Sequence, residues 1–182
     1  MIVWIVLGIV LLIVILFISY YNKFMVLKNQ IDEAWSSIDV QLKRRYDLIP
    51  NLVEIVKGYA SHEKETLTKV IEARSKALGA KTIDEKIKFE GELTGPLKSL
   101  LMLTENYPDL KANENFIQLQ KELVNIEDHI QNARRYYNAV VRDYNTMLET
   151  FPSVLVANML KLEKRPYFEI EEQERENVKI KF

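Results

Sequence analysis

The sequence has no cysteine and little glycine or proline. Without cysteine, the chain cannot form disulfides, thiol nucleophiles, zinc ribbons or a lipoprotein anchor, and its redox compartment stays undetermined. Only five Gly and five Pro occur in 182 residues, and few segments alternate like β-strands. The composition therefore predicts an all-α protein.

Nor does the chain carry an excess of either charge. The 25 Lys and Arg residues nearly balance the 26 Asp and Glu residues, so there is no general electrostatic surface for nucleic acid. Only two histidines are present, and Tyr59 and Ile126 stand three residues before them, where a di-metal helix bundle would have Glu. No phosphate-binding loop or nucleophile elbow occurs. The sequence predicts no metal, no cofactor and no enzymatic activity.

One long hydrophobic run stands at the N-terminus. Residues 2–18 are apolar apart from Gly8, and Tyr20 and Tyr21 extend the run to the length that spans a hydrocarbon core. A cleaved signal peptide is the alternative, but no Lys or Arg precedes the run and no small-residue cleavage site follows it. We therefore predict an uncleaved transmembrane anchor over residues 1–21. Lys23 and Lys28 on its C-terminal flank predict the N-terminus outside and the following domain in the cytoplasm.

Apolar residues repeat at helical spacing directly after the anchor, from Phe24 to Leu42. This spacing predicts that the anchor continues into a first bundle helix without a flexible linker. Pro50 then requires a helix to end, kink or restart. We favour a tight turn with Asp47 as N-cap, which would leave Arg44 and Arg45 at a helix C-terminus; a kinked continuous helix is the alternative.

Two further helices are predicted before residue 108. The second would run from Ile49, with Gly58 as a weak point inside it, to a stop at Gly79. A capping box at Thr82-x-x-Glu85 would open the third. Gly95-Pro96 would bend this third helix, which is expected to end near residues 107–108.

Residues 113–151 carry the most regular pattern of the chain. Apolar residues occur there in alternating steps of three and four, a heptad seam that is typical of long helices with partner helices. The pattern predicts a fourth long helix capped by Asn113, with its tyrosines packed in the seam. The seam residues are Phe116, Leu119, Leu123, Ile126, Ile130, Ala133, Tyr137, Val140, Tyr144, Met147 and Phe151.

We therefore predict an N-terminal transmembrane helix (1–21) followed by an antiparallel four-helix bundle with long helices (22–152). A C-terminal tail (153–182) would comprise a short amphipathic stretch and a charged, poorly ordered end over 171–182. The apolar stretch with its basic neighbours would lie either at the membrane interface or across the end of the bundle.

Several stretches of the sequence stand out as motifs: WSSIDVQLKRRYDLIPNLV (35–53), VKGYASHE (56–63), YPDLKA (107–112), FIQLQ (116–120), ARRYYN (133–138), DYN (143–145) and FP (151–152). These motifs resemble those of the LemA proteins. The resemblance extends over almost the whole chain, including the anchor and Tyr167-Phe168. It implies a membrane-anchored antiparallel helical bundle of bacterial type and no established biochemical activity.

Our leading hypothesis is a non-enzymatic scaffold that binds protein partners at its membrane-distal end, with self-association as a further possibility. Rigid bundles concentrate binding residues in their loops. A second hypothesis is a bundle core that binds a lipid or another small molecule, lined by Tyr59, Glu63, Thr66 and Tyr137. The candidate interaction residues of the first hypothesis are Arg44, Arg45, Asp47, Asn51, Tyr107, Asp109 and Lys111.

Overall fold

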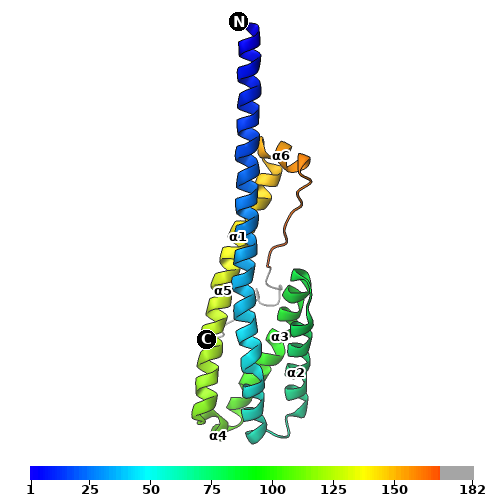
Figure 1. The fold of residues 1–182 in the computed structure, drawn as a ribbon. Helices are drawn as coiled ribbons and strands as arrows, with labels where there is room; N and C mark the ends of the chain where they lie inside the picture. The colour runs from blue at the N-terminus through cyan, green and yellow to red at the C-terminus, as the bar shows by residue number, and fades with distance from the viewer. Residues whose placement is uncertain (169–182) are drawn as a thin grey trace, which may run out of the picture. The chain divides into compact units, whose positions relative to one another are not determined.

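The computed structural model of the protein describes residues 1–168, and every regular element in that range is a helix (Figure 1). This confirms the predicted all-α class. The charged end predicted over 171–182 lies outside the described residues. The elements are α1 (Ile2–Tyr59), α2 (Lys64–Gly79), α3 (Ile83–Met102), the 3-10 turn η1 (Leu103–Glu105), α4 (Pro108–Lys111), α5 (Glu114–Glu149) and α6 (Ser153–Met159).

The turn predicted at residues 44–53 does not exist. Helix α1 continues through Pro50 and ends at Tyr59, so the prediction of a tight turn is wrong and the alternative of a continuous helix is right in that respect. Pro50 has no N–H, and the carbonyl of Tyr46 consequently loses its partner within the helix. The side chain of Arg74, from α2, replaces that partner, because its Nε donates to the Tyr46 carbonyl at 2.7 Å.

The first chain reversal falls at residues 60–63, after α1. Gly58 consequently lies near the end of α1, and α2 starts at Lys64, well after the predicted start at Ile49. The predicted stop at Gly79 is confirmed, since Gly79 is the last residue of α2.

The predicted capping box opens α3. Thr82 Oγ1 accepts from the Glu85 backbone N–H at 3.1 Å, and Glu85 Oε2 accepts from the Thr82 N–H at 3.2 Å. Backbone hydrogen bonds from Lys81 and Thr82 also lower the pKa of the Glu85 carboxyl. The helix passes through Pro96 and ends at Met102, earlier than predicted, because the chain tightens into η1 and the short α4.

Asn113 caps α5 as predicted, since its Oδ1 accepts from the Phe116 N–H at 2.9 Å. The heptad seam of α5 is largely buried, with Tyr137 and Tyr144 among the buried residues. Phe151 is the exception: it is 81% exposed and lies beyond the end of the helix at Glu149. The sequence pattern extended one seam position too far.

Residues 1–37 and 133–167 form one compact unit, and residues 38–132 belong to a second. In the first unit, ring pairs join α1 to α5: Phe24 meets Tyr144 edge-on with ring centroids 6.0 Å apart, and Trp35 meets Tyr137 at 5.7 Å. Helix α6 lies beside α1 (Figure 1). In the second unit, α2 and α3 pack side by side (Figure 1).

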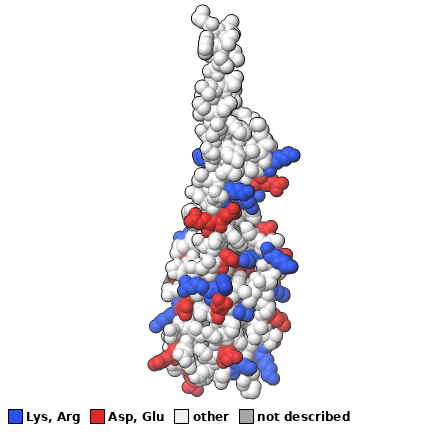
Figure 2. Space-filling view, in the orientation of Figure 1, with Lys and Arg blue, Asp and Glu red and all other residues white. Residues whose placement is uncertain are grey.

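The N-terminal part of α1 is apolar and exposed. Within the described residues α1 is the one helix that is long and apolar enough to cross a membrane, and its most apolar window is not covered by other parts of the chain. Figure 2 shows this segment without charge and Lys and Arg side chains at the level where it ends. The apolar N-terminal helix is therefore present as predicted.

Candidate functional site

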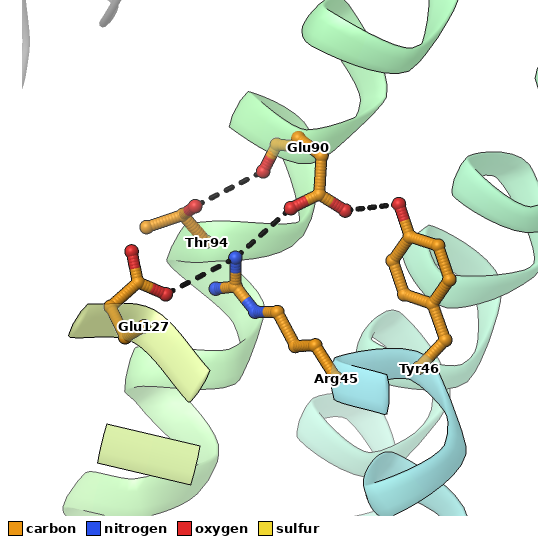
Figure 3. A network of polar contacts seen from close by, with 5 residues as sticks. All are labelled: Arg45, Tyr46, Glu90, Thr94 and Glu127. Atoms are coloured by element: carbon orange, nitrogen blue, oxygen red, sulfur yellow. Dashed lines mark hydrogen bonds and ion pairs between the residues drawn. The ribbon is translucent and has the colours of Figure 1, made fainter. Parts of the chain in front are cut away.

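The second unit contains a buried charged cluster built on Arg45 (Figure 3). The Arg45 Nη1 donates to Glu90 Oε2 of α3 at 3.0 Å and lies 3.4 Å from Glu127 Oε2 of α5. Arg45 is 6% exposed and Glu90 is 4% exposed. Charged residues are rarely buried to this degree unless they are paired. One guanidinium thus joins three helices in the core.

Tyr46 completes the cluster from the neighbouring position of α1. Its hydroxyl donates to Glu90 Oε1, so both carboxylate oxygens of Glu90 accept hydrogen bonds. Burial, followed by the charge and the hydrogen bond of Glu90, raises the pKa of Tyr46 far above its ordinary value near 10. Tyr46 is therefore a protonated donor at neutral pH, and each carboxyl oxygen of Glu90 has one donor in the cluster.

The backbone of Tyr46 is held as firmly as its side chain. Pro50 has no N–H to donate to the Tyr46 carbonyl, and Arg74 Nε donates to that carbonyl instead. Residues 45 and 46 of α1 consequently contact α2, α3 and α5 within one short segment. Another ion pair, between Lys86 of α3 and Asp39 of α1, supports the same helix pairing.

The arrangement is suited to positioning helices. A buried ion pair gains little net stability, because desolvation offsets the attraction, but it strongly penalises any packing that leaves one charge alone. The Arg45 Nε is itself buried without a hydrogen-bond partner among residues 1–168, which lowers the net stability that the cluster gives to the observed packing. The cluster therefore favours one register of α1 against α3 and α5.

Chemically, the cluster offers neither a nucleophile nor a free base. The Glu90 carboxylate already accepts from Arg45 and Tyr46, and the Tyr46 phenol is held protonated. In residues 1–168, no group of three or more His, Cys, Asp or Glu side chains is placed to hold a metal ion.

The predicted interaction residues are placed in two different settings. Arg44, Asp47 and Asn51 are exposed on α1, where their spacing puts them on one face of the helix. Arg45 is buried in the charged cluster, so its predicted place at a surface turn is corrected. The remaining residues, Tyr107, Asp109 and Lys111, lie at or in α4. Between these two groups, the described residues show no hydrogen bond or ion pair.

The segment that meets Tyr107 is the turn at residues 60–63. The Tyr107 hydroxyl donates to Glu63 Oε1 at 3.2 Å, and Asn113 Nδ2 donates to the Tyr59 hydroxyl at 3.0 Å. Burial, together with the bond to Glu63 and its charge, raises the pKa of Tyr107. We name this group, residues 59–63 with 107–113, the loop end of the second unit.

The side chains expected to line a ligand-binding core do not form one group. Tyr59 and Glu63 make the hydrogen bonds of the loop end. Tyr137 belongs to the first unit, where it packs against Trp35 and donates to the Pro166 carbonyl at 3.0 Å. The predicted lining is thus divided between two units, and a ligand in the core stays an untested prediction.

Sequence reasoning missed Glu90 and Tyr46, although a signal for Glu90 is present. The apolar stripe of α3 steps from Ile87 to Leu93, and the position that should fill this interval is Glu90. A charged residue on a buried stripe indicates a partner charge on a facing helix. Arg45 occupies the corresponding interval between Leu42 and Ile49 of α1.

Sequence comparisons relate the chain to known proteins. The sequence model of the LemA family matches residues 34–182. The chain is similar to Protein LemA of Metamycoplasma hominis, with 31% identity over 89% of this chain and 74% of the relative.

More distant similarity extends to proteins of two further organisms. Magnetosome protein MamQ 2 of Paramagnetospirillum magneticum is 23% identical over 82% of this chain, and Magnetosome protein MamQ of Magnetospirillum gryphiswaldense is 22% identical over 81%. The matched part spans 64% of each of those proteins, so their whole-protein roles do not transfer. From the family match and the 31% identical relative, the chain belongs to the LemA family.

Proposed function

We propose that this protein is a membrane-anchored, non-enzymatic scaffold whose helical domain presents an interaction surface to protein partners. The observation that carries the proposal is the continuity of α1, in which the uncharged N-terminal segment leads into packed helix without a linker. Phe24, three residues after Tyr21, is already fully buried and pairs with Tyr144. A membrane-spanning segment joined in this way would hold the first unit close to the bilayer at a defined orientation.

The long helices are proposed to form an antiparallel four-helix bundle. Support comes from the order in which residues of α1 and α5 meet. Phe24 pairs with Tyr144, and the later Trp35 pairs with the earlier Tyr137. Arg45 and Glu127 continue the same reversed order in the second unit. Contacts whose positions increase along one helix and decrease along the other are those of antiparallel neighbours.

The proposed topology has the N-terminus outside and the helical domain in the cytoplasm. Lys23 and Lys28 on the C-terminal flank of the apolar segment support this orientation. Protease added to intact cells should leave the domain undigested, whereas protease added to permeabilised cells should remove it. Digestion in intact cells would reverse the proposed orientation.

The proposed partner surface is the loop end, with the exposed α1 face as its competitor. Asp109 and Lys111 are exposed at the loop end, and Arg44 and Asp47 are exposed on α1. Two charge swaps that keep the net charge can separate these surfaces: D109K with K111E, and R44E with D47K. Loops on a rigid helical support favour the first.

Crosslinking mass spectrometry of the full-length protein in its native membrane tests the scaffold proposal. We expect reproducible crosslinks from Lys64, which both variants retain, to one other protein, and we expect D109K/K111E to abolish them while R44E/D47K preserves them. Loss only in R44E/D47K would move the surface to α1. Crosslinks confined to the chain or to its own copies would remove the support for a partner scaffold and leave self-association.

A further inference from the structure

A basic pocket lies in the first unit, away from the charged cluster and the loop end. It has a volume of about 280 Å³ and is lined by Lys28 of α1, Tyr144 of α5 and residues 161–165 after α6. The lining contains four cationic side chains, those of Lys28, Lys161, Lys164 and Arg165, and the single carboxylate of Glu163.

Most of this positive charge is not neutralised within the described chain. Lys164 pairs with Glu149. In contrast, the side chains of Lys28, Lys161 and Arg165 make no hydrogen bond or ion pair with another residue of 1–168. The lining thus carries more positive than negative charge, and within residues 1–168 none of these three groups is paired with a carboxylate. Such an arrangement attracts an anion.

The segment that carries these cations is held in place by buried side chains of α5. Asn145, which is buried, donates through Nδ2 to the Arg165 carbonyl at 2.9 Å and accepts through Oδ1 from the Arg165 N–H at 3.0 Å. Tyr137 donates to the next carbonyl, that of Pro166. Arg165 therefore stands at a defined place on the helical support.

Lys161 occupies a backbone position at which glycine is usual. Its φ is 51°, and the hydrogen bonds from Leu162 N–H to Ala157 O (3.0 Å) and from Lys161 N–H to Asn158 O (3.2 Å) form the Schellman motif that ends α6. A left-handed conformation is unfavourable for a residue with a Cβ. A lysine in this strained conformation suggests that its side chain has a function.

The pocket is near the end of the apolar segment. Lys28 follows Tyr21 by seven residues, which corresponds to about 10 Å along a helix, and lysine side chains can extend back toward a membrane interface. Next to it, α6 and the residue pair before it expose three apolar side chains at four-residue spacing: Phe151 (81%), Leu155 (56%) and Met159 (71%). Such a stripe with basic neighbours is typical of interfacial helices.

We propose that the basic pocket binds the phosphate headgroup of an anionic phospholipid, with the apolar stripe of Phe151, Leu155 and Met159 among the acyl chains. This inference rests on the proposed membrane anchoring and adds a lipid-specific site to it. Lys28, Lys161 and Arg165 provide the positive charge for the phosphate, and the Tyr144 ring forms one wall of the pocket.

Native mass spectrometry of the full-length protein in detergent micelles tests the site. Dioleoylphosphatidylglycerol should be retained in preference to dioleoylphosphatidylcholine. Lys28→Ala and Arg165→Ala should each weaken retention of the anionic lipid roughly fivefold, the change expected for one cation at a lipid surface. Lys23→Ala is the matched control, because it removes the same charge from the same helix but Lys23 does not line the pocket. This variant should retain the anionic lipid as well as the parent protein does.

Lys161→Gly separates a ligand role from a structural one. Glycine relieves the left-handed backbone, so the melting temperature should be unchanged or higher. Retention of the anionic lipid should nevertheless weaken by the same factor as for Lys28→Ala. Parental retention by this variant would exclude Lys161 from the site and overturn the assignment.

Two other outcomes would also overturn the proposal. If Lys23→Ala weakens lipid retention as much as Lys28→Ala, lipid binding depends on the general positive charge beside the apolar segment and not on the pocket. If inorganic phosphate in excess displaces the lipid completely, the pocket is a site for free phosphate. Carbonate extraction of native membranes tests the anchoring separately: release of the parent protein would contradict the membrane anchor, while the micelle experiment would still report on the pocket.

Discussion

Both units bury apolar side chains, but they differ in the contacts that join α1 to its neighbours in addition to that core. In the first, α1 meets α5 through aromatic pairs, Phe24 with Tyr144 and Trp35 with Tyr137. In the second, α1 meets α3 and α5 through the buried charges of Arg45, Glu90 and Glu127. Ring burial contributes stability in proportion to the area removed from water. The ion pair contributes mainly by excluding other registers. The aromatic pairs of the first unit therefore add mainly stability, whereas the charged cluster of the second unit adds mainly specificity to an apolar core.

The largest effect is expected from Phe24→Ala in the aromatic region. Phe24 is fully buried, so its truncation should lower the free energy of unfolding by about 3–5 kcal/mol through lost burial and the resulting cavity. Denaturant titration of the full-length protein in micelles, followed by circular dichroism, measures the change. Val26→Ala is the control, because Val26 is 53% exposed on the same helix. A cost of Phe24→Ala below that of the control would show that the ring pairs contribute little.

Glu90→Ala should cost nearly as much in the charged region. The substitution leaves the Arg45 guanidinium buried with only the more distant Glu127, and the loss of one member of a buried ion pair costs about 3–5 kcal/mol. We expect a value near the lower limit, since Glu127 remains. Glu92→Ala is the control on the same helix as Glu90. It removes a carboxylate from an exposed ion pair with Lys76 of α2 and should cost about 0–1 kcal/mol by the same titration. Equal costs would contradict the assignment of the burial penalty to Arg45.

Tyr46→Phe should have an intermediate effect. It removes one hydrogen bond to a charged carboxylate, for which about 1.5–3 kcal/mol is typical. The loss should be measured at neutral pH, where the phenol is protonated in both folded and unfolded chains. Because the folded pKa of Tyr46 is raised, its stabilising contribution is present in full below the unfolded pKa.

The same contribution should disappear in alkali. Above the unfolded pKa, about 10 for tyrosine, the unfolded chain loses a proton that the folded chain retains, so stability falls as pH rises. The difference in unfolding free energy between the parent and Tyr46→Phe should therefore shrink above about pH 10. A difference that stays constant from pH 8 to pH 11 would contradict the raised pKa.

The smallest effect concerns the proline in α1. Arg74→Ala removes the donor to the Tyr46 carbonyl and should cost about 1–2 kcal/mol for an unsatisfied acceptor. Pro50→Ala supplies a backbone N–H for the same carbonyl. In the double variant the cost of Arg74→Ala should consequently be smaller than in the parent background. A double-mutant cycle measures this coupling, and strict additivity would show that Arg74 does not compensate for Pro50.

Much of the local structure could be predicted from particular residues. The capping box at Thr82 and Glu85 and the cap at Asn113 act within a few residues of chain, so their physical causes are visible in the sequence. Helix α2 also ends at the predicted Gly79, although that glycine does not adopt the positive φ of a glycine cap. The heptad seam of α5 is likewise a property of one segment. Its prediction failed only at Phe151, where the helix had already ended.

The candidate site was predicted less well because its partners are distant in the sequence. Arg45 and Glu90 are 45 residues apart. The sequence indicates their pairing only indirectly, because each is a charged residue on an otherwise apolar stripe. The interpretation of Arg45 as a residue at a helix end used local information alone. The basic pocket likewise joins α1 to the segment after α6, a contact that no local pattern contains.

The sequence by itself determined the helical class, the apolar N-terminal segment and most helix ends, because these depend on residue spacing and on capping groups within a single turn. The tertiary structure decided the course of α1 through Pro50. Proline leaves a carbonyl unsatisfied wherever it stands in a helix interior, and whether the chain turns or continues depends on what reaches that carbonyl. Here Arg74 reaches it from another helix, the first turn falls at residues 60–63, and Arg45 lies in the core.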